Sequence, residues 1–332
     1  MPIVRVDPRA PDPAVIARAA AALWRGELVA FPTETVYGLG ANALDAAAVA
    51  RIFAAKGRPA HNPLIVHVPD AGAAAAVVRE WPDTAARLAA RFWPGPLTLV
   101  LPRAPAVPDI VTAGLDTVAV RVPSHPVALA LLAAAGCPVA APSANRFTEL
   151  SPTRAEHVAR ALGDGVALVL DGGPSTVGIE STVVDLSGAL PVLLRPGVLS
   201  AAELEPLTGP LGVPAPAASE DAPRPAPGMT TRHYAPRATL RLFRGGERQA
   251  AAAAARAEHE RGGVVGALLR STLDAPIRHP IVMPRDPAGY ARELYAALHA
   301  LDDAGCSLVL VESVPDAPAW AGVRDRLERG SR

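Results

Sequence analysis

Apolar positions along this chain recur at two spacings, which predict alternating strands and helices. Short apolar runs of strand length occupy 28–31, 64–68, 97–101, 117–122, 138–141, 166–170, 182–186 and 192–194. Helical spacing predicts helices over 13–24, 46–56, 70–79, 83–93 and 125–135, and another that opens at 151–153. Because several strands follow one another without a helix between them, the pattern favours a mixed, twisted α/β sheet with flanking helices.

The periodicity disappears between residues 209 and 236, where Pro, Ala and Gly dominate. This composition is typical of a semi-extended linker, although Met229, Arg232, His233 and Tyr234 are unusual in a simple spacer. Strands over 238–243, 264–268 and 307–311 then alternate with helices over 247–261, 288–301 and 319–328. We therefore expect a larger domain over 1–208, a Pro-rich linker over 209–236, and a smaller Rossmann-like parallel α/β domain over 237–332.

Composition narrows the class of protein. The 332 residues carry a net charge of zero, which argues against a protein whose main affinity is for nucleic acid. Cys137 and Cys306 lie in apolar runs without a CxxC pattern, as expected for reduced thiols. The N-terminus has no signal-peptide pattern, and no apolar run approaches the length of a membrane span. These features predict a soluble, cytoplasmic protein with no membrane partner.

The stretch from Gly26 to Val68 contains the first chemical signal. A polar, Gly-bearing loop from Thr33 to Asn42 leads into a helix that ends at Lys56, with Asp45 as its N-cap and Gly57 as its stop. Lys56 is the only lysine among the 32 basic residues of a chain that otherwise uses arginine. A lysine that persists in such a composition suggests a role for a compact, mobile ammonium group.

Polar groups gather at the ends of the predicted strands. These are Thr33, Glu34, Thr35, Lys56, Arg58, Asn62, His67, Thr117, Arg121, Ser143, Asn145, Ser181 and Arg195. Polar side chains from several strand ends commonly build a small-molecule site in an α/β sheet. Four of them are cationic and few are acidic, which suits a ligand with several negative charges, such as a nucleoside triphosphate together with a carboxylate.

Residues 38–43 also match G-x-G-x-x-A. However, the acidic residue expected about 20 positions later in a dinucleotide-binding fold is missing. The sequence therefore disfavours a dinucleotide site here.

A set of motifs in this order resembles the threonylcarbamoyl-AMP synthase family, with its YrdC-like fold. The motifs are FPTETVYGLG, the pair Lys56-x-Arg58 followed by Asn62-Pro63-Leu64, WPGPLT, GLDTVAVRVP, APSAN, DGG, ESTVVD and LLRPG. The later APGM and HYAP motifs, followed by a C-terminal α/β domain, resemble the longer, two-domain form of that family. The resemblance implies an enzyme that makes L-threonylcarbamoyladenylate and pyrophosphate from L-threonine, bicarbonate and ATP. The product would serve threonylcarbamoyladenosine modification of tRNA beside the anticodon.

The resemblance also implies roles for matching positions. L-Threonine would be bound by Thr35, His67, Arg121, the Ala141 backbone and Ser181. ATP would be bound by Lys56, Arg58, Asn62, Thr117, Ser143, Asn145, Ser151, Arg195 and, from the linker, Tyr234. Lys56 and Arg58 would be the catalytic pair, and magnesium would accompany ATP, with ligands that the sequence does not identify. Apart from the resemblance, two roles for the linker stay open: it folds back over the site as a lid that excludes water, or it is a plain tether between the domains.

Two other functions stay open at this point. The fold also resembles a domain of carbamoyltransferases that use carbamoyl phosphate, although those chains carry additional zinc-finger segments whose cysteines are missing here. A tRNA- or double-stranded-RNA-binding module is the second alternative, against which the zero net charge counts. The expected partners are the downstream tRNA threonylcarbamoyl-transfer machinery and, at most, a weak contact with tRNA itself.

Overall fold

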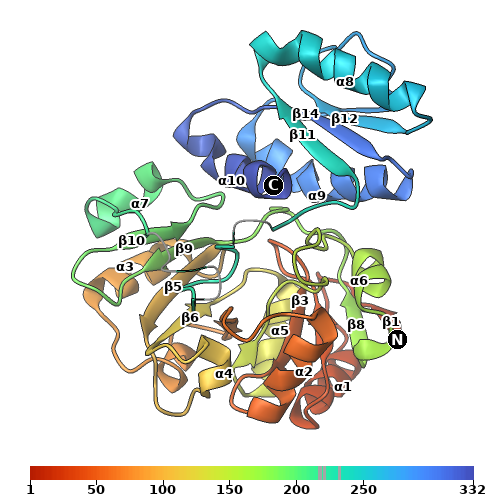
Figure 1. The fold of residues 1–332 in the computed structure, drawn as a ribbon. Helices are drawn as coiled ribbons and strands as arrows, with labels where there is room; N and C mark the ends of the chain where they lie inside the picture. The colour runs from red at the N-terminus through yellow and green to blue at the C-terminus, as the bar shows by residue number, and fades with distance from the viewer. Residues whose placement is uncertain (216–218, 220–221, 231–232) are drawn as a thin grey trace.

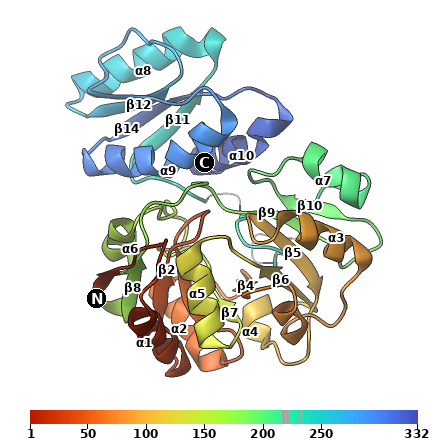
Figure 2. The ribbon, with the colours of Figure 1, turned by 180° about the vertical axis from the view of Figure 1, so that it is seen from behind.

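In the computed structural model, two α/β domains lie one above the other, and the linker runs between them (Figure 1). The structure describes residues 1–215, 219, 222–230 and 233–332. Arg232, which the linker pattern singled out, lies outside the described residues. The C-terminus lies at the seam between the domains in both ribbon views (Figures 1 and 2).

The larger domain is built on one mixed sheet of ten strands. These are β1 (Ile3–Arg5), β2 (Val29–Phe31), β3 (Gly38–Asn42), β4 (Ile65–His67), β5 (Leu97–Pro102), β6 (Thr117–Arg121), β7 (Val139–Ala140), β8 (Leu168–Asp171), β9 (Thr182–Asp185) and β10 (Val192–Arg195). Their order is β1-β8-β2-β3-β7-β4-β6-β5-β9-β10. β4 and β6 pair in parallel whereas β5 and β6 pair antiparallel, which confirms the mixed sheet expected from the sequence.

Local capping interactions explain helix ends in this domain. They are α1 (Pro13–Trp24), α2 (Ala46–Lys56), α3 (Asp83–Phe92), α4 (Asp109–Thr112), α5 (Pro126–Ala135), α6 (Ala155–Leu162) and α7 (Ala201–Thr208), with 3-10 turns η1 (Ala73–Ala76) and η2 (Gly163–Gly165). The Asp45 carboxylate accepts hydrogen bonds from two backbone N–H groups at the start of α2. Gly57 ends that helix at a φ of 61°, where glycine carries no Cβ penalty.

Two predictions from the periodicity are wrong. Residues 70–79 form only the short η1 turn, because the chain leaves helical geometry after it to pair with a neighbouring segment: Arg79 N–H donates to the Pro102 carbonyl at 2.8 Å, and Ala104 N–H to the Val77 carbonyl at 2.8 Å. Gly38–Asn42 is strand β3 rather than part of a loop. At position 40 a Cβ would collide with the Phe31 ring, so glycine is what lets β3 pair closely with β2. The sequence reading also missed β1, α4 and α7.

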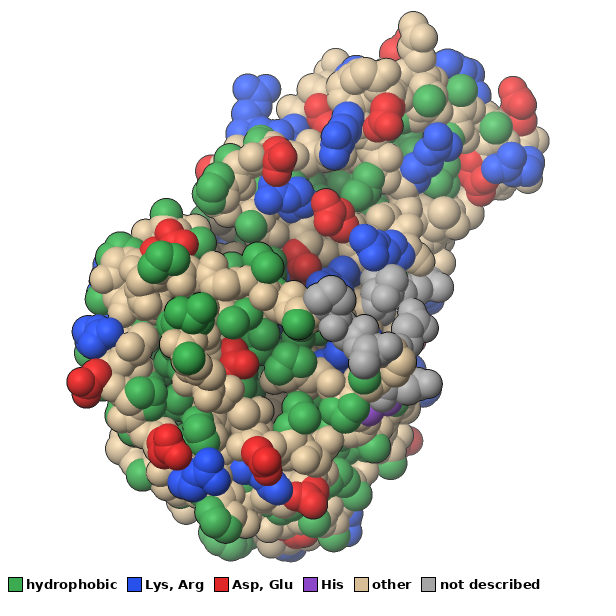
Figure 3. Space-filling view, turned by 60° about the vertical axis from the view of Figure 1, so that its left-hand side comes forward, with side chains coloured by type: hydrophobic (Ala, Val, Ile, Leu, Met, Phe, Trp, Pro, Cys, Tyr) green, Lys and Arg blue, Asp and Glu red, His purple; other side chains and the backbone are tan. Residues whose placement is uncertain are grey.

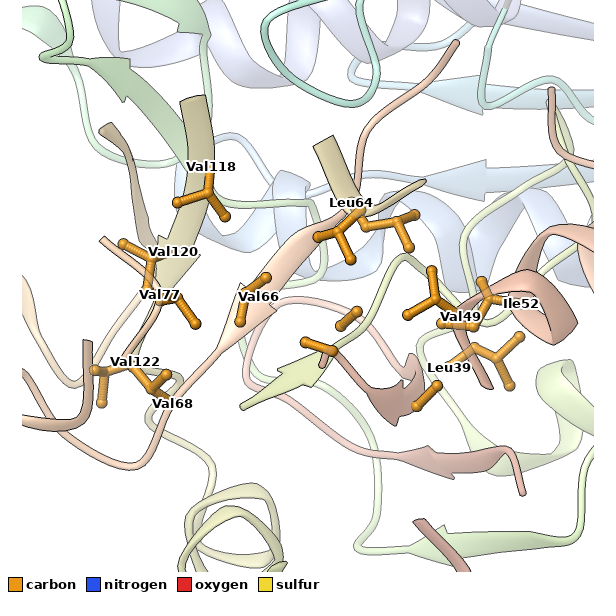
Figure 4. Close-up of a cluster of buried hydrophobic side chains, with 14 of the residues drawn as sticks. Leu39, Val49, Ile52, Leu64, Val66, Val68, Val77, Val118, Val120 and Val122 are labelled. Atoms are coloured by element: carbon orange, nitrogen blue, oxygen red, sulfur yellow. The ribbon is translucent and has the colours of Figure 1, made fainter. Parts of the chain in front are cut away.

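Both faces of the large sheet are covered. On one face, α1 and α5 pack on residues such as Val29, Phe31 and Val139. On the other, α2 packs its Val49 and Ile52 toward Leu39 and neighbouring strand residues, as Figure 4 shows. This aliphatic core holds the strand ends in fixed positions, which any site built on those ends requires.

The smaller domain has a parallel four-stranded sheet. Its strands β11 (Thr239–Phe243), β12 (Val265–Leu269), β13 (His279–Val282) and β14 (Leu308–Glu312) lie in the order β11-β14-β12-β13. Its helices are α8 (Arg248–Glu260), α9 (Pro287–Asp303) and α10 (Ala321–Gly330), with 3-10 turns η3 (Gly245–Glu247) and η4 (Pro318–Trp320). α8 covers the outer face of the sheet, while α9 and α10 face the larger domain (Figures 1 and 2). The parallel architecture was predicted, although β13 was missed.

The contact between the domains is a packed core. Val36, Leu150 and Ile179 of the larger domain belong to the same buried apolar cluster as Leu294 and Tyr295 of α9. Beside it, the rings of His157 and His299 stack with their centroids 3.8 Å apart. The seam therefore resembles a domain interior. Among the residues described, no helix is both long and apolar enough to cross a bilayer.

Candidate functional site

A small cavity lies where strand ends of the large sheet meet the linker. It is lined by Thr33, Thr35, Val36, Gly38, Arg58, Ile65, His67, Arg121, Ala141, Pro142, Ser143, Glu180, Ser181, Arg195, Pro227, Gly228, His233 and Tyr234. Its volume is about 50 Å³, whereas sites for drug-sized ligands typically enclose roughly 300–1,000 Å³. The last four of these lining residues belong to the linker, so the linker forms one wall of the cavity.

Strand alternation explains why so many functional side chains meet here. Ile65 and Ala119 point to the sheet face that the linker covers with Ala226, while Val66 and Val120 point to the opposite core. Side chains two residues apart on a strand share a face. His67 and Arg121, each two residues further along β4 and β6, therefore lie under the linker.

Arg195 reaches the cavity because β10 is irregular. Val192 and Leu194 face the linker side, and regular alternation would turn the next residue to the other face. The pairing of β10 with β9 shifts register between Leu193 and Arg195. Such a bulge re-aims the side chain that follows it, and it brings the guanidinium of Arg195 onto Ser181.

Three buried cations line or adjoin the cavity with carbonyl groups as their main partners. Lys56 Nζ donates to the carbonyl oxygens of Ser143 and Asn145, both at 2.5 Å. Arg58 donates to the Asn62 carbonyl at 3.1 Å and the Asn62 side chain at 2.7 Å. Arg195 donates to the Ser181 carbonyl at 3.0 and 3.1 Å. Within the described ranges, none of the three forms an ion pair with a carboxylate.

Burial makes this cation cluster receptive to negative charge. Burial first, and then the neighbouring Arg58, lower the pKa of Lys56 well below its usual value. Burial likewise lowers the pKa of Arg58 and of Arg195. A cation that has lost its water and lacks a counter-ion gains most when an anion arrives. The cluster therefore fits a ligand with several negative charges.

Another group of cavity residues contains a paired cation. Arg121 donates to the Glu34 carboxylate at 2.6 Å and to Thr35 Oγ1 at 2.9 Å, and all three residues are buried. His67 lies beside them, and burial followed by the nearby Arg121 lowers its pKa to about 3. His67 is therefore neutral at physiological pH. This group presents a guanidinium fork, a hydroxyl and a neutral imidazole, which suits a small carboxylate bearing an amine.

Several buried polar atoms here lack a hydrogen-bond partner in the described part of the structure. They include His67 Nδ1, Asn145 Oδ1, His233 Nδ1 and Tyr234 Oη. Buried polar atoms are normally satisfied, because an unmade hydrogen bond costs about 1–3 kcal/mol. Their concentration around one cavity indicates groups that await a ligand.

The structure gathers most of the site residues named from the sequence. Thr35, His67, Arg121, Ala141 and Ser181 line the cavity, as do Arg58, Ser143, Arg195 and Tyr234. Lys56, Asn62 and Asn145 stand directly behind that lining through the hydrogen bonds given above. Their roles in binding stay predictions.

Two of the named residues lie differently from the rest. Ser151 donates its hydroxyl to Glu180. Thr117 shares a strand face with Arg121 but lies four residues away along β6, or about 13 Å at a rise of ~3.3 Å per residue. Thr117 is therefore close enough to contact a ligand bound at Arg121 only if that ligand extends along β6.

The sequence reading assigned no role to Glu180 or Gly228. Glu180 directly precedes Ser181, but the partners of its carboxylate come from distant segments and leave no local signal. Gly228 adopts a φ of 81°, and a Cβ there would collide with Tyr234 Oη. Glycine alone lets this turn of the linker approach Tyr234 so closely.

No side-chain cluster suited to a metal accompanies the cavity. Among the residues described, no group of three or more His, Cys, Asp or Glu side chains could hold a metal ion. The nearest carboxylates, Glu34 and Glu180, are already paired with Arg121 and Arg326. A magnesium ion would therefore depend mainly on oxygen ligands of a bound phosphate.

Comparison with known proteins gives consistent matches along the whole chain. The family described as Telomere recombination (Sua5, YciO and YrdC) matches residues 21–197. The family described as Threonylcarbamoyl-AMP synthase, C-terminal domain, matches residues 199–331.

Individual relatives are similar over almost their full length. The chain is 44% identical over 318 residues to the threonylcarbamoyl-AMP synthase of Pyrococcus abyssi, covering 94% of this chain and 93% of that protein. It is 41% identical over 322 residues to the synthase of Bacillus subtilis, covering 95% and 92%. A crystal structure of P. abyssi Sua5 complexed with L-threonine matches with a TM-score of 0.92 at 42% identity, covering 100% of this chain and 98% of that chain.

The Glu34–Arg121 pair offers a direct test of the packing at this site. Replacing Glu34 with Gln keeps the shape but leaves the buried guanidinium without its carboxylate. We expect the free energy of unfolding, measured by urea denaturation, to fall by about 3 kcal/mol. Glu80→Gln is the control, because its pair with Arg79 is exposed, and it should change this value by less than about 0.5 kcal/mol. Equal effects of the two substitutions would contradict this description of the pair.

Proposed function

Because the chain belongs to the threonylcarbamoyl-AMP synthase family, as its motifs predicted, we propose that it makes L-threonylcarbamoyladenylate and pyrophosphate from L-threonine, bicarbonate and ATP. The observation that supports this reaction best is the cluster of Lys56, Arg58 and Arg195. Among the described residues these three buried cations have no carboxylate partner, and they match the charge of a triphosphate. Arg121 already donates to Glu34, Thr35 and the Gly95 carbonyl, but a guanidinium has further N–H donors, which match the carboxylate of an amino acid.

The cavity divides the substrates between its two ends. At one end, Arg121 binds the threonine carboxylate, and Thr35, His67 and Ser181 surround the amine and hydroxyl. The related P. abyssi structure was solved with L-threonine, which supports this class of ligand for the same fold. At the other end, Lys56, Arg58 and Arg195 bind the phosphates. The Ala141 backbone, which also lines the cavity, donates its N–H to the Ile65 carbonyl at 2.9 Å, and we assign it to the threonine side.

In this reaction the protein mainly has to position the substrates and to stabilise negative charge. The neutral amine of threonine attacks the carbon of bicarbonate; the N–C bond forms, a C–O bond of bicarbonate breaks, and the departing hydroxyl takes a proton from the amine and leaves as water, which gives a carbamate. A carbamate oxygen then attacks the α-phosphorus of ATP, the new P–O bond forms, and pyrophosphate leaves in line. Holding the carbamate and the phosphate together supplies the proximity. Lys56 and Arg58 stabilise the charge that develops on the phosphoryl group and on the leaving pyrophosphate.

Magnesium enters this scheme as part of its substrate, the Mg–ATP complex. Mg²⁺ commonly keeps several water ligands and binds through substrate phosphates with few protein ligands. That mode agrees with a cavity whose nearest carboxylates are occupied by arginines. Bound with ATP, magnesium would share the neutralisation of the phosphate charge with the buried cations.

The adenylate is a mixed anhydride that water can hydrolyse, so its consumer should act soon after release. We propose that tRNA threonylcarbamoyl-transfer enzymes consume it to modify the adenosine beside the anticodon. The surface gives little support to direct, tight RNA binding. On the face in Figure 3, basic and acidic side chains are interspersed rather than gathered into one basic patch.

The reaction is tested by measuring pyrophosphate release from Mg–ATP while threonine and bicarbonate are omitted in turn. We expect release to require both, and label from threonine to appear in an adenylate. Adduct formation that depends on carbamoyl phosphate and not on ATP would favour a carbamoyltransferase instead. Release that ignores threonine would contradict the proposal.

Lys56 is expected to contribute strongly to the rate. Lys56→Ala removes a buried ammonium that stands behind the cavity lining and that we propose turns to the phosphates when ATP binds, so kcat for pyrophosphate release should fall at least ~10²-fold, as when an oxyanion donor is removed. Arg51→Ala, an exposed change on the same helix, is the control and should leave kcat unchanged. Near-normal turnover in Lys56→Ala would show that this ammonium does not act on the phosphates.

A further inference from the structure

An arginine of the second domain reaches into the candidate site of the first. The Arg326 side chain, on helix α10, has no exposed surface. Its Nε donates to Glu180 Oε2 at 2.7 Å and its Nη2 to the Glu180 carbonyl at 3.3 Å. Its Nη1 donates to the Pro196 carbonyl at 2.9 Å and to Asp325 at 2.8 Å. Most of its hydrogen bonds therefore cross the seam between the domains.

Glu180 is held from both sides of that seam. Tyr295 of helix α9 donates its hydroxyl to Glu180 Oε2 at 3.1 Å, and Ser151 donates from the larger domain. Glu180 lines the cavity and directly precedes Ser181. Ser181 in turn bonds Thr98 Oγ1 at 2.7 Å, and its carbonyl accepts from Arg195. A shift of Glu180 would therefore move a residue at each end of the cavity.

The same helix also holds the linker over the cavity. Arg329 Nη1 donates to the Thr230 carbonyl at 2.6 Å, and the His233 N–H donates to the Arg329 carbonyl at 3.3 Å. The Arg326 guanidinium lies over the Tyr234 ring, 5.0 Å from its centroid. Asp325 bonds both arginines and so fixes their positions on the helix.

The backbone of Tyr234 shows why such support is needed. Tyr234 has a φ of 61°, a left-handed conformation that is strained for a non-glycine residue. Such strain persists where the surroundings over-determine the conformation. The contact with Arg326 and the close approach of Gly330 to the Tyr234 carbonyl come from α10, where a Cβ on residue 330 would lie 3.0 Å from that oxygen.

We propose that Arg326 is a positioning residue of the reaction: seated across the seam, it fixes Glu180, and thereby Ser181 and Arg195, while holding Tyr234 of the linker over the cavity. This inference rests on the proposed function for its kinetic consequences. It gives the second domain a defined part in catalysis, because the site is complete only when α10 is docked. The alternative is that the Arg326–Glu180 pair merely joins the two domains.

The pKa of Glu180 distinguishes a positioning role of Arg326 from a role that only joins the two domains. Burial by itself raises the pKa of Glu180, but Arg326 and Arg195 together with hydrogen bonds outweigh burial and bring that pKa to about 2. Glu180 is therefore ionised throughout the physiological range. Without Arg326, burial still raises the pKa of Glu180, but the largest interaction that lowers it is lost. The pKa of Glu180 therefore rises. A carboxyl that positions Ser181 and Arg195 would then make catalysis depend on pH.

The test compares Arg326→Gln with Arg324→Gln in the full chain. Arg324 is on the same helix but bonds the Pro315 carbonyl and Asp316 of its own domain, so it is a matched control. We expect Arg326→Gln to lower kcat/KM for threonine about 10²-fold, as for a misplaced catalytic group, and to add an acidic limb to its pH profile. Arg324→Gln should retain the wild-type value and the wild-type profile.

A double variant checks the origin of that limb. In Glu180→Gln with Arg326→Gln no carboxyl titrates at this position, so the acidic limb should disappear while the rate stays low. If Arg326→Gln does not fold, Tyr295→Phe removes a single donor to Glu180 and should give a several-fold loss with a limb in the same direction. A folded Arg326→Gln enzyme with wild-type kcat/KM, or with a loss that is equal at every pH, would overturn the proposal.

Amide hydrogen exchange at His233 and Ala235 supplies a readout that needs no turnover. We expect faster exchange at these linker positions in Arg326→Gln than in Arg324→Gln, because the Tyr234 conformation loses its support. If wild-type protein shows no threonine-dependent pyrophosphate release, the proposed function fails, and exchange still decides whether Arg326 holds the linker. Unchanged exchange would overturn that part of the inference.

Discussion

Three buried cations that pair with no carboxylate in the described part of the chain are the constraint on which this molecule depends. A charge removed from water is costly unless it is paired or well hydrogen-bonded. Lys56, Arg58 and Arg195 meet that condition only in part, through carbonyl oxygens at the ends of strands and in adjoining loops. The remaining electrostatic imbalance is what a polyanionic substrate can relieve. The rigid sheet and its aliphatic core keep the three groups close despite their mutual repulsion.

The second domain also affects the electrostatic balance around these buried cations. It supplies Arg326 to Glu180, a carboxylate that lies close to this cluster, and it packs an apolar surface onto the larger domain beside it. Glu180 is thus ion-paired with Arg326 rather than with Lys56 or Arg58. The pairing keeps the cations available for a ligand, and it ties the order of the cavity to the docking of α10.

Local sequence signals were enough for most of the fold and for much of the site. The caps at Asp12, Asp45 and Gly57 fixed helix ends within a residue, because their side-chain or backbone geometry acts locally. The position of His67 and Arg121 at predicted strand ends was enough to assign both to one site. The prediction of a helix over 70–79 was wrong because Val78 and Arg79 pair with residues more than 20 positions later, which no local pattern shows. Non-local features carried no such signal: Arg326 and Glu180 are separated by 146 positions, and the bulge at Arg195 reverses what alternation implies.

The most direct test of this account is a crystal structure of the chain with L-threonine and a non-hydrolysable ATP analogue. The account predicts that phosphate oxygens lie within hydrogen-bond distance of Lys56, Arg58 and Arg195, with the threonine carboxylate on Arg121 at the other end of the cavity. If the phosphates bind elsewhere while these three cations keep their carbonyl partners, the cluster is a structural feature and the central claim is wrong.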